Sequence, residues 1–235
     1  MKENIELVQG RIEKAAAKIG KTAVDIKLIA VTKTHPLKII ETALQNGIKF
    51  IAENKVQDSE DKIPKLKGKY TEFHFIGHLQ SNKIKRILSL QPDLIHSIDK
   101  FSTARKISQY LGEHQLPDQN ILIEVNTSRE DSKFGVPVDD VINLVKQISK
   151  LPNIKIIGLM TVGMFTSDEE ILRSCFQILK QLFDDIKQKN IPNIEMKYLS
   201  MGMSNDYEIA IEEGSNMIRV GTAIFGTREY KGSSE

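Results

Sequence analysis

A lysine stands at the end of a predicted buried strand near the start of the chain. The apolar run 28–31 is flanked by charged residues and is followed by Lys33 and then by Pro36, which ends the strand. Because side chains alternate along a strand, Lys33 shares a face with Val31 and Ile29. A partly desolvated lysine favours its neutral amine, which can attack a carbonyl and form a Schiff base. The alternative is an ordinary solvated lysine.

Glycines and hydroxyl side chains gather near the other end of the chain, in segments 199–204 and 219–222. Glycine lets backbone N–H groups approach an anion, and hydroxyls add further donors, so these segments predict a phosphate site. Arg219 alternates with Gly221 onto one face and is expected deeper in the interior. The alternative is that Gly202 and Gly221 only permit tight turns and that Arg219 pairs with a carboxylate such as Glu53.

The elements that must position these groups alternate between strand and helix. Strands are predicted at 28–33, 49–54, 72–77, 93–99, 120–126, 154–160, 196–201 and 217–222. Helices are predicted at 5–19, 36–47, 56–66, 81–90, 102–111, 137–150, 167–186 and 207–213. In the helix at 167–186, Ser167 and Glu170 are expected to form a capping box, and Ile171 to lie on the buried face.

This order predicts a single (βα)8 TIM barrel with an extra N-terminal helix, extending over residues 1–235. The rival is an open doubly wound sheet, which would carry a Gly-rich loop after its first strand, and segment 31–36 contains no glycine. In a barrel the carboxyl ends of the strands form one mouth, and the loops after strands seven and eight are the usual phosphate site. We therefore expect Lys33 across the mouth from that site.

Composition excludes several classes of protein. The 235 residues carry a net charge of +2, and the densest basic clusters, at 62–69 and 83–86, lack the aromatic residues of a nucleic-acid platform. No apolar run approaches the roughly 18 residues of a membrane span, which predicts a cytoplasmic protein. One cysteine excludes an internal disulfide, and the histidines at 35, 74, 78 and 96 lack metal-ligand spacing, so we predict no metal site.

An amine, a phosphate site and an inward arginine together indicate a phosphorylated aldehyde, for which pyridoxal phosphate (PLP) is the natural candidate. Seven segments carry a family pattern that runs from the first strand to the last: 30–34, 52–57, 74–83, 96–99, 158–160, 199–204 and 219–226. In them the chain resembles the pyridoxal-phosphate homeostasis protein family, the single-domain relatives of the alanine racemase barrel among fold type III PLP-binding proteins.

The resemblance implies six cofactor-binding residues at the strand ends: Lys33, Asn54, Ser200, Arg219, Gly221 and Thr222. Lys33 would hold PLP as a Schiff base. Ser200, Gly221 and Thr222 would bind its phosphate. Arg219 would face the pyridine nitrogen, where a permanent cation weakens the ring as an electron sink.

Asn54 would border the ring or the phosphate of the cofactor. The family pattern has a glycine where this chain has Ala52, and the extra methyl group is expected to narrow the mouth near Asn54. The segment 77–83 also matches the family and is expected to be a partner or ligand surface.

The function implied by the resemblance is a protein that buffers PLP or delivers it transiently to PLP-dependent apo-enzymes, without robust turnover and as a monomer. Racemase-type relatives carry a further β-domain with a second acid/base, whereas about a dozen residues follow the last strand here. One alternative is a racemase-like enzyme that uses Lys33 as its sole base. Another is an aldolase-type barrel in which Lys33 attacks a phosphorylated sugar.

Overall fold

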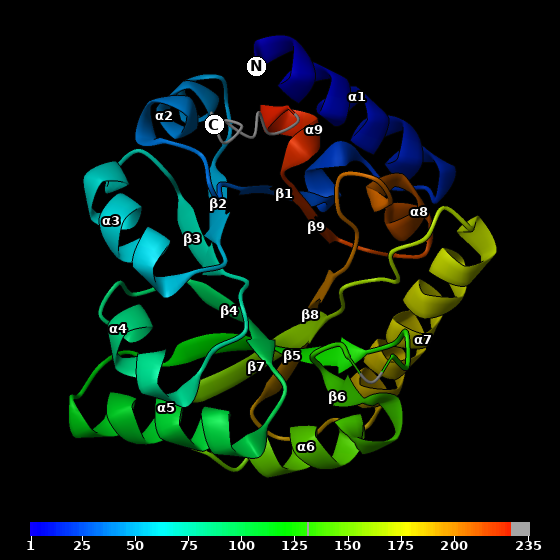
Figure 1. Cartoon of the computed structure of the whole chain (residues 1–235). Coiled ribbons are helices and arrows are strands. Elements are labelled where there is room, and N and C mark those ends of the chain that lie inside the picture. The colour runs from blue at the N-terminus through cyan, green and yellow to red at the C-terminus, as the bar shows by residue number, and fades with distance from the viewer. Residues whose placement is uncertain (131, 227–235) are drawn as a thin grey trace, which may run out of the picture.

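The strands form a closed parallel barrel (Figure 1). The computed structural model describes residues 1–130 and 132–226, so the tail expected after the last strand lies outside the described residues from 227 on. The barrel strands are β1 (Lys27–Val31), β2 (Phe50–Glu53), β3 (Glu72–Phe75), β4 (Leu94–Ile98), β5 (Gln119–Asn126), β7 (Ile154–Met160), β8 (Ile194–Ser200) and β9 (Met217–Val220). Neighbours pair in this order, and β9 pairs with β1 to close the ring. The predicted (βα)8 barrel is confirmed.

Helices surround the barrel, and the extra N-terminal helix is present (Figure 1). The helices are α1 (Lys2–Lys18), α2 (Leu37–Gln45), α3 (Val56–Leu66), α4 (Ile84–Leu88), α5 (Phe101–Glu113), α6 (Val141–Ile148), α7 (Glu169–Gln188), α8 (Tyr207–Glu212) and α9 (Thr222–Phe225). Short 3-10 turns occupy Ala23–Asp25, Ser81–Lys83 and Val138–Asp140. No helix of the described residues is long and apolar enough to cross a membrane.

Several expected element ends differ from the structure. The helix expected at 81–90 is a 3-10 turn followed by α4, and the one expected at 137–150 is preceded by a short strand, β6 (Val136–Pro137), which pairs with β5. The capping box at Ser167 is wrong, because Asp168 is the N-cap and accepts from the N–H groups of Glu170 and Ile171. Ile171 is 39% exposed and so does not belong to the buried face.

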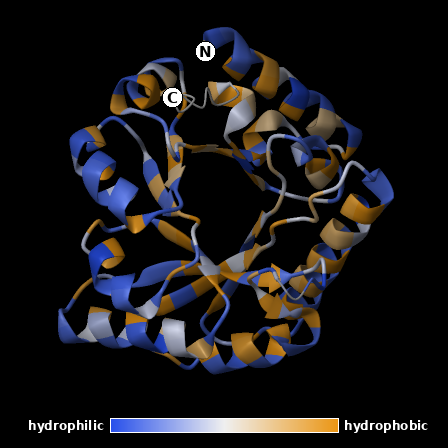
Figure 2. Cartoon of the chain, viewed as in Figure 1, coloured by the Kyte–Doolittle hydropathy of each residue, from blue (hydrophilic) through white to orange (hydrophobic). Residues whose placement is uncertain are grey.

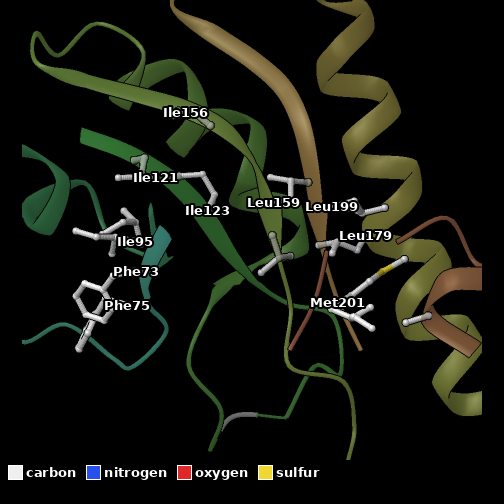
Figure 3. Packing of buried hydrophobic residues seen from close by; sticks show 14 of the residues in the cluster. Phe73, Phe75, Ile95, Ile121, Ile123, Ile156, Leu159, Leu179, Leu199 and Met201 are labelled. Atoms are coloured by element: carbon white, nitrogen blue, oxygen red, sulfur yellow. The ribbon is translucent and has the colours of Figure 1, made fainter. Parts of the chain in front are cut away.

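Apolar side chains fill two layers, one on each face of the barrel wall. The outer layer lies between strands and helices and includes Phe73 and Phe75 of β3 and Ile121 of β5 (Figure 3). Hydrophobic and hydrophilic residues alternate along the surrounding helices, as expected for helices with one buried face (Figure 2). The inner layer is smaller and consists of Ile29, Ala52, Leu94, Leu122, Ile157, Met160 and Met217.

Helix α1 packs on the last two helices, α8 and α9. Ile5, Val8 and Ile12 form its buried face, and the Asn4 side-chain amide donates to the carbonyl of Ile224 at 3.0 Å. The N-terminal helix therefore holds α9, which follows the last barrel strand, in place at the mouth.

Candidate functional site

The segment that carries Lys33 is anchored through the residue before it. Lys33 lies two residues after the end of β1 and is half-buried. The backbone N–H of Thr32 donates to the Ala52 carbonyl at 2.9 Å, and its hydroxyl donates to Glu53 Oε1 at 2.7 Å. Lys62 Nζ donates to the Thr32 carbonyl at 3.1 Å. These bonds fix the direction in which the chain leaves β1 and so place Lys33 at the mouth.

A buried ion pair supports this anchor. Lys62 Nζ lies 2.8 Å from Glu53 Oε1, with the Glu53 side chain 0% and the Lys62 side chain 10% exposed. The alternative in which Glu53 pairs with Arg219 is therefore wrong, because Lys62 and the Thr32 hydroxyl take this carboxylate. Among the residues that the structure describes, Glu53 Oε2 has no hydrogen-bond partner.

A cradle of N–H groups lies where β9 ends and α9 begins. The backbone N–H groups of Gly221 and Ala223 both donate to the Ser204 hydroxyl, at 3.1 and 3.2 Å. Gly202 allows the preceding loop to turn, because its φ is +95° and an added Cβ would lie 2.6 Å from the Ala210 methyl group. Two N–H groups that converge on one oxygen are suited to bind an anion such as phosphate.

The Lys33 segment lies beside this cradle, so the expectation that it lies across the mouth is wrong. Strand β1 pairs with β9, with Ala30 opposite Val220, because the first and last strands of a closed barrel are neighbours. His35 also stacks on Phe225 of α9, with ring centroids 4.5 Å apart. The amine-bearing segment and the anion cradle therefore adjoin.

Ser200 and Arg219 lie beneath the cradle in the barrel interior. Arg219 Nη1 donates to Ser200 Oγ at 2.7 Å, and Nη2 donates to the Thr161 carbonyl at 2.8 Å. Ser200 Oγ also lies 3.2 Å from His96 Nδ1. The phosphate role of Ser200 stays a prediction, and Ser204 is a candidate that sequence reasoning missed. Both serines belong to segment 199–204, and their spacing does not tell which hydroxyl faces the cradle.

Burial alters the titration of charged groups around the mouth. Burial lowers the pKa of Arg219 to about 10, which leaves it cationic at neutral pH. Burial and the negative charge of Asp99 raise the pKa of Glu124 to about 7, and burial also raises that of Asp206. Glu124 had not been identified from the sequence, since a glutamate inside a strand is ordinarily solvent-facing.

Asn54 directly follows β2, which pairs with β1 on the side away from β9. It lines a cavity of about 450 Å³ together with His78 and Lys83, and Gly77 packs on its carbonyl so closely that an added Cβ would lie 1.9 Å away. The methyl group of Ala52 is fully buried in the inner apolar layer, and its expected effect on the width of the mouth near Asn54 stays a prediction. The cofactor role of Asn54 stays a prediction.

Two of the histidines considered as metal ligands lie inside the barrel. His74 and His96 lie within β3 and β4, are fully buried, and are joined by a 2.9 Å hydrogen bond between His74 Nδ1 and His96 Nε2. Within residues 1–130 and 132–226, no group of three or more His, Cys, Asp or Glu side chains is placed to hold a metal ion.

Comparison with known proteins gives a family. Residues 4–229 match the model of the alanine racemase N-terminal domain. The chain is 37% identical over 228 residues to the pyridoxal phosphate homeostasis protein of Aquifex aeolicus, and the match covers 97% of this chain and 98% of the relative. It is 39% identical over 234 residues to the pyridoxal phosphate homeostasis protein of Vibrio cholerae, and that match covers 98% of this chain and 97% of the relative. PipY of Synechococcus elongatus, solved with PLP bound, superposes with a TM-score of 0.79 at 29% identity, covering 92% of this chain and 100% of PipY. The chain therefore belongs to the pyridoxal phosphate homeostasis protein family.

Proposed function

We propose that this chain binds PLP at the mouth of the barrel, holds it through a Schiff base to Lys33, and buffers it or delivers it to other proteins. The relatives that bear the family name and the PLP-bound PipY support the choice of ligand. The observation that supports the proposal is the pairing of β1 with β9, because the segment that carries Lys33 follows β1 and the anion cradle follows β9.

The residues present fit a phosphorylated aldehyde. The N–H groups of Gly221 and Ala223 and the hydroxyl of Ser204 supply the phosphate donors, and Thr222 is exposed beside them at the start of α9. A phosphate oxygen would replace the Ser204 hydroxyl oxygen as the acceptor of both N–H groups, and the displaced hydroxyl would then donate to the phosphate.

Lys33 supplies the covalent attachment. Its neutral Nζ adds to the aldehyde carbon, and loss of one water leaves a C=N bond that water can break again. The anchor at Thr32 keeps the backbone of this segment fixed while the long side chain reaches the aldehyde. Attachment is therefore reversible, as a buffering protein requires.

Arg219 favours holding over turnover. In this proposal it meets the pyridine nitrogen of PLP, and its guanidinium stays cationic at neutral pH. A cation at that nitrogen disfavours its protonation and weakens the ring as an acceptor of electrons from a substrate carbon.

The test is the absorbance spectrum of the purified protein, incubated with PLP and then reduced with borohydride. We expect a yellow protein that bleaches, with a pyridoxyl group on the peptide that contains Lys33. The Lys33→Ala variant should carry no adduct, whereas Lys49→Ala, which removes an exposed lysine next to the amino end of β2, should behave like the unaltered protein. A colourless protein without adduct would refute the proposal, and an adduct with a sugar phosphate alone would favour the aldolase alternative.

A racemase-like enzyme is the second candidate, and Glu124 is the observation that favours it. A carboxyl group with a pKa of about 7, close enough to Arg219 to be affected by its charge, can exchange protons near neutral pH. Hydrogen exchange at the α-carbon of amino acids in deuterated water separates the two functions. If hydrogen exchange occurs at enzyme-like rates and the Lys33→Ala substitution abolishes it, the proposed carrier function is refuted.

Delivery and oligomeric state are tested separately. A carrier that delivers PLP should activate a PLP-dependent apo-enzyme faster than the protein's own PLP release allows, whereas a passive buffer should never exceed that rate. Light scattering checks the expected monomer.

A further inference from the structure

A continuous chain of polar side chains crosses the inside of the barrel. It consists of Lys27, Glu72, His74, His96, Ser200 and Arg219. Lys27 and Glu72 begin their strands, whereas Ser200 ends β8, so the chain runs from the amino ends of the strands toward the mouth. Apart from the anchor of Arg219, the mouth site described above does not use it.

Every link is within hydrogen-bond distance. Lys27 Nζ lies 2.7 Å from Glu72 Oε1, and Glu72 Oε2 lies 2.8 Å from His74 Nε2. His74 Nδ1 lies 2.9 Å from His96 Nε2, and His96 Nδ1 lies 3.2 Å from Ser200 Oγ. Both imidazoles are fully buried, so water does not compete for the bond between the two rings or for the bond from His96 to Ser200.

The positions of the protons in this series of hydrogen-bonded side chains follow from the charged groups at its two ends. The hydrogen bond from His74 and the neighbouring Lys27 hold the pKa of Glu72 near 2, so its carboxylate can only accept. His74 Nε2 must therefore carry a proton. Burial lowers the pKa of both histidines, so each imidazole is neutral and carries one proton only.

The remaining protons are then determined one by one. With its proton on Nε2, His74 presents a bare Nδ1 and accepts from His96 Nε2–H. His96 in turn presents a bare Nδ1, and the Ser200 hydroxyl donates to it. The lone pairs of Ser200 are left to accept from Arg219 Nη1.

We propose that His74 and His96 are positioning residues. Their hydrogen bonds link the Lys27–Glu72 pair to Ser200 and fix the Ser200 hydroxyl as an acceptor for Arg219 at the mouth. Arg219 is anchored at Nη1 by Ser200 and at Nη2 by the Thr161 carbonyl. The two bonds together define the plane of the guanidinium. If the Ser200 proton turned toward Arg219, two donors would face each other and one anchor would be lost.

The first test needs no ligand. Proton positions on histidine rings can be read from two-bond ¹H–¹⁵N correlation spectra of protein labelled with ¹⁵N-histidine. We expect both His74 and His96 to be protonated at Nε2. In Glu72→Gln, Lys27 takes the amide oxygen and the amide N–H group faces His74 Nε2, so both rings should change to the form protonated at Nδ1.

The matched control is Glu195→Gln, which alters a glutamate of β8 that is half-exposed and paired with Lys155. It should leave both rings unchanged. Either ring protonated at Nδ1 in the unaltered protein, or a His96 that keeps its form in Glu72→Gln, would overturn the proposal. Glu72 does not touch His96, so a purely local effect of the substitution would stop at His74.

The second test measures PLP affinity and rests on the proposed function. His96→Leu removes the acceptor for Ser200, and we expect the Kd for PLP to rise about tenfold, which corresponds to about 1.4 kcal/mol. His96→Asn can place an amide oxygen where Nδ1 lies and should stay within about threefold of the unaltered protein. Equal affinities of the two variants would overturn the proposal. If the unaltered protein binds no PLP, the proposed function fails, while the ring spectra still decide this inference.

Discussion

Breaking the buried pair of Lys62 and Glu53 should be among the most damaging single changes away from the outer core. Lys62→Met leaves a carboxylate with no exposed surface. Within residues 1–130 and 132–226, one of its oxygens then has no partner and the other has only the Thr32 hydroxyl. Removing one member of a buried ion pair costs about 3 to 5 kcal/mol, because the remaining charge is uncompensated. We expect a loss of that size in the free energy of unfolding.

The apolar double variant separates charge from packing. In Glu53→Leu/Lys62→Met no charge remains, the Thr32 hydroxyl can donate to the Ala52 carbonyl 3.1 Å away in place of Glu53, and the Thr32 carbonyl still accepts from the N–H of His35. Replacing both members of such a pair by apolar residues is often neutral or stabilising, so we expect stability within about 1 kcal/mol of the unaltered protein.

Urea unfolding followed by circular dichroism at pH 7 measures both variants. Lys155→Met is the control, because the pair of Lys155 with Glu195 is half-exposed on both sides and should contribute less than about 1 kcal/mol. The reasoning is refuted if Lys62→Met costs no more than this control, or if the double variant is as unstable as Lys62→Met alone.

Three further changes test other parts of the structure. The pKa of Glu124 is raised from 4.5 to about 7. The folded state therefore loses stability as the pH rises from about 4.5 to 7, by about 3 kcal/mol at most. Glu124→Gln should raise the urea midpoint at pH 8 and leave it unchanged near pH 4.5. Gly77→Ala places a Cβ 1.9 Å from a main-chain oxygen and should lower the free energy of unfolding by about 2 kcal/mol or more. Gly10→Ala lies within α1, where an added Cβ meets open space, and should raise the free energy of unfolding by about 0.5 to 1 kcal/mol in the same assay. Asp168→Ala removes the cap of α7 and should cost about 1 kcal/mol in thermal unfolding, whereas Ser167→Ala should change little.

Elements with a strong period could be predicted almost to the residue. The helix expected at 56–66 and the strand expected at 154–160 agree with α3 and β7 at both ends. In the first, apolar residues recur on one helical face, and in the second a mostly aliphatic run is typical of a largely buried strand. The closure of the barrel followed from the number and order of such elements.

Choices between neighbouring residues of similar chemistry could not be predicted. Asp168 and Ser167 are both good N-caps, and the structure selects Asp168 by the backbone angles of one residue. In the same way Ser204, rather than Ser200, meets the N–H groups of Gly221 and Ala223. Composition does not distinguish such neighbours, because the outcome depends on the path of the loop.

Which side chains meet across two neighbouring strands depends on the register of the strands, and the periodicity of the sequence does not predict that register. Alternation on β3 places Glu72 and His74 on one face and Phe73 on the other. That His74 meets His96 follows only from the register of β3 with β4, in which His74 lies opposite Leu94. The error about Lys33 was of another kind, because closure of the barrel already implies that the first strand adjoins the last.

The two layers of the barrel contribute to different properties of the protein: the outer layer mainly to stability and the inner layer to the geometry of the site. The outer layer buries most of the apolar residues and supplies most of the hydrophobic free energy. The inner layer shares its space with the polar chain from Lys27 to Arg219, and hydrogen-bonded polar groups that replace apolar ones add little net stability. Outer substitutions such as Phe73→Ala should therefore lower stability while the histidine rings keep their proton positions. Glu72→Gln should instead change the proton positions of both rings, because it reverses a chain of bonds without removing apolar contacts.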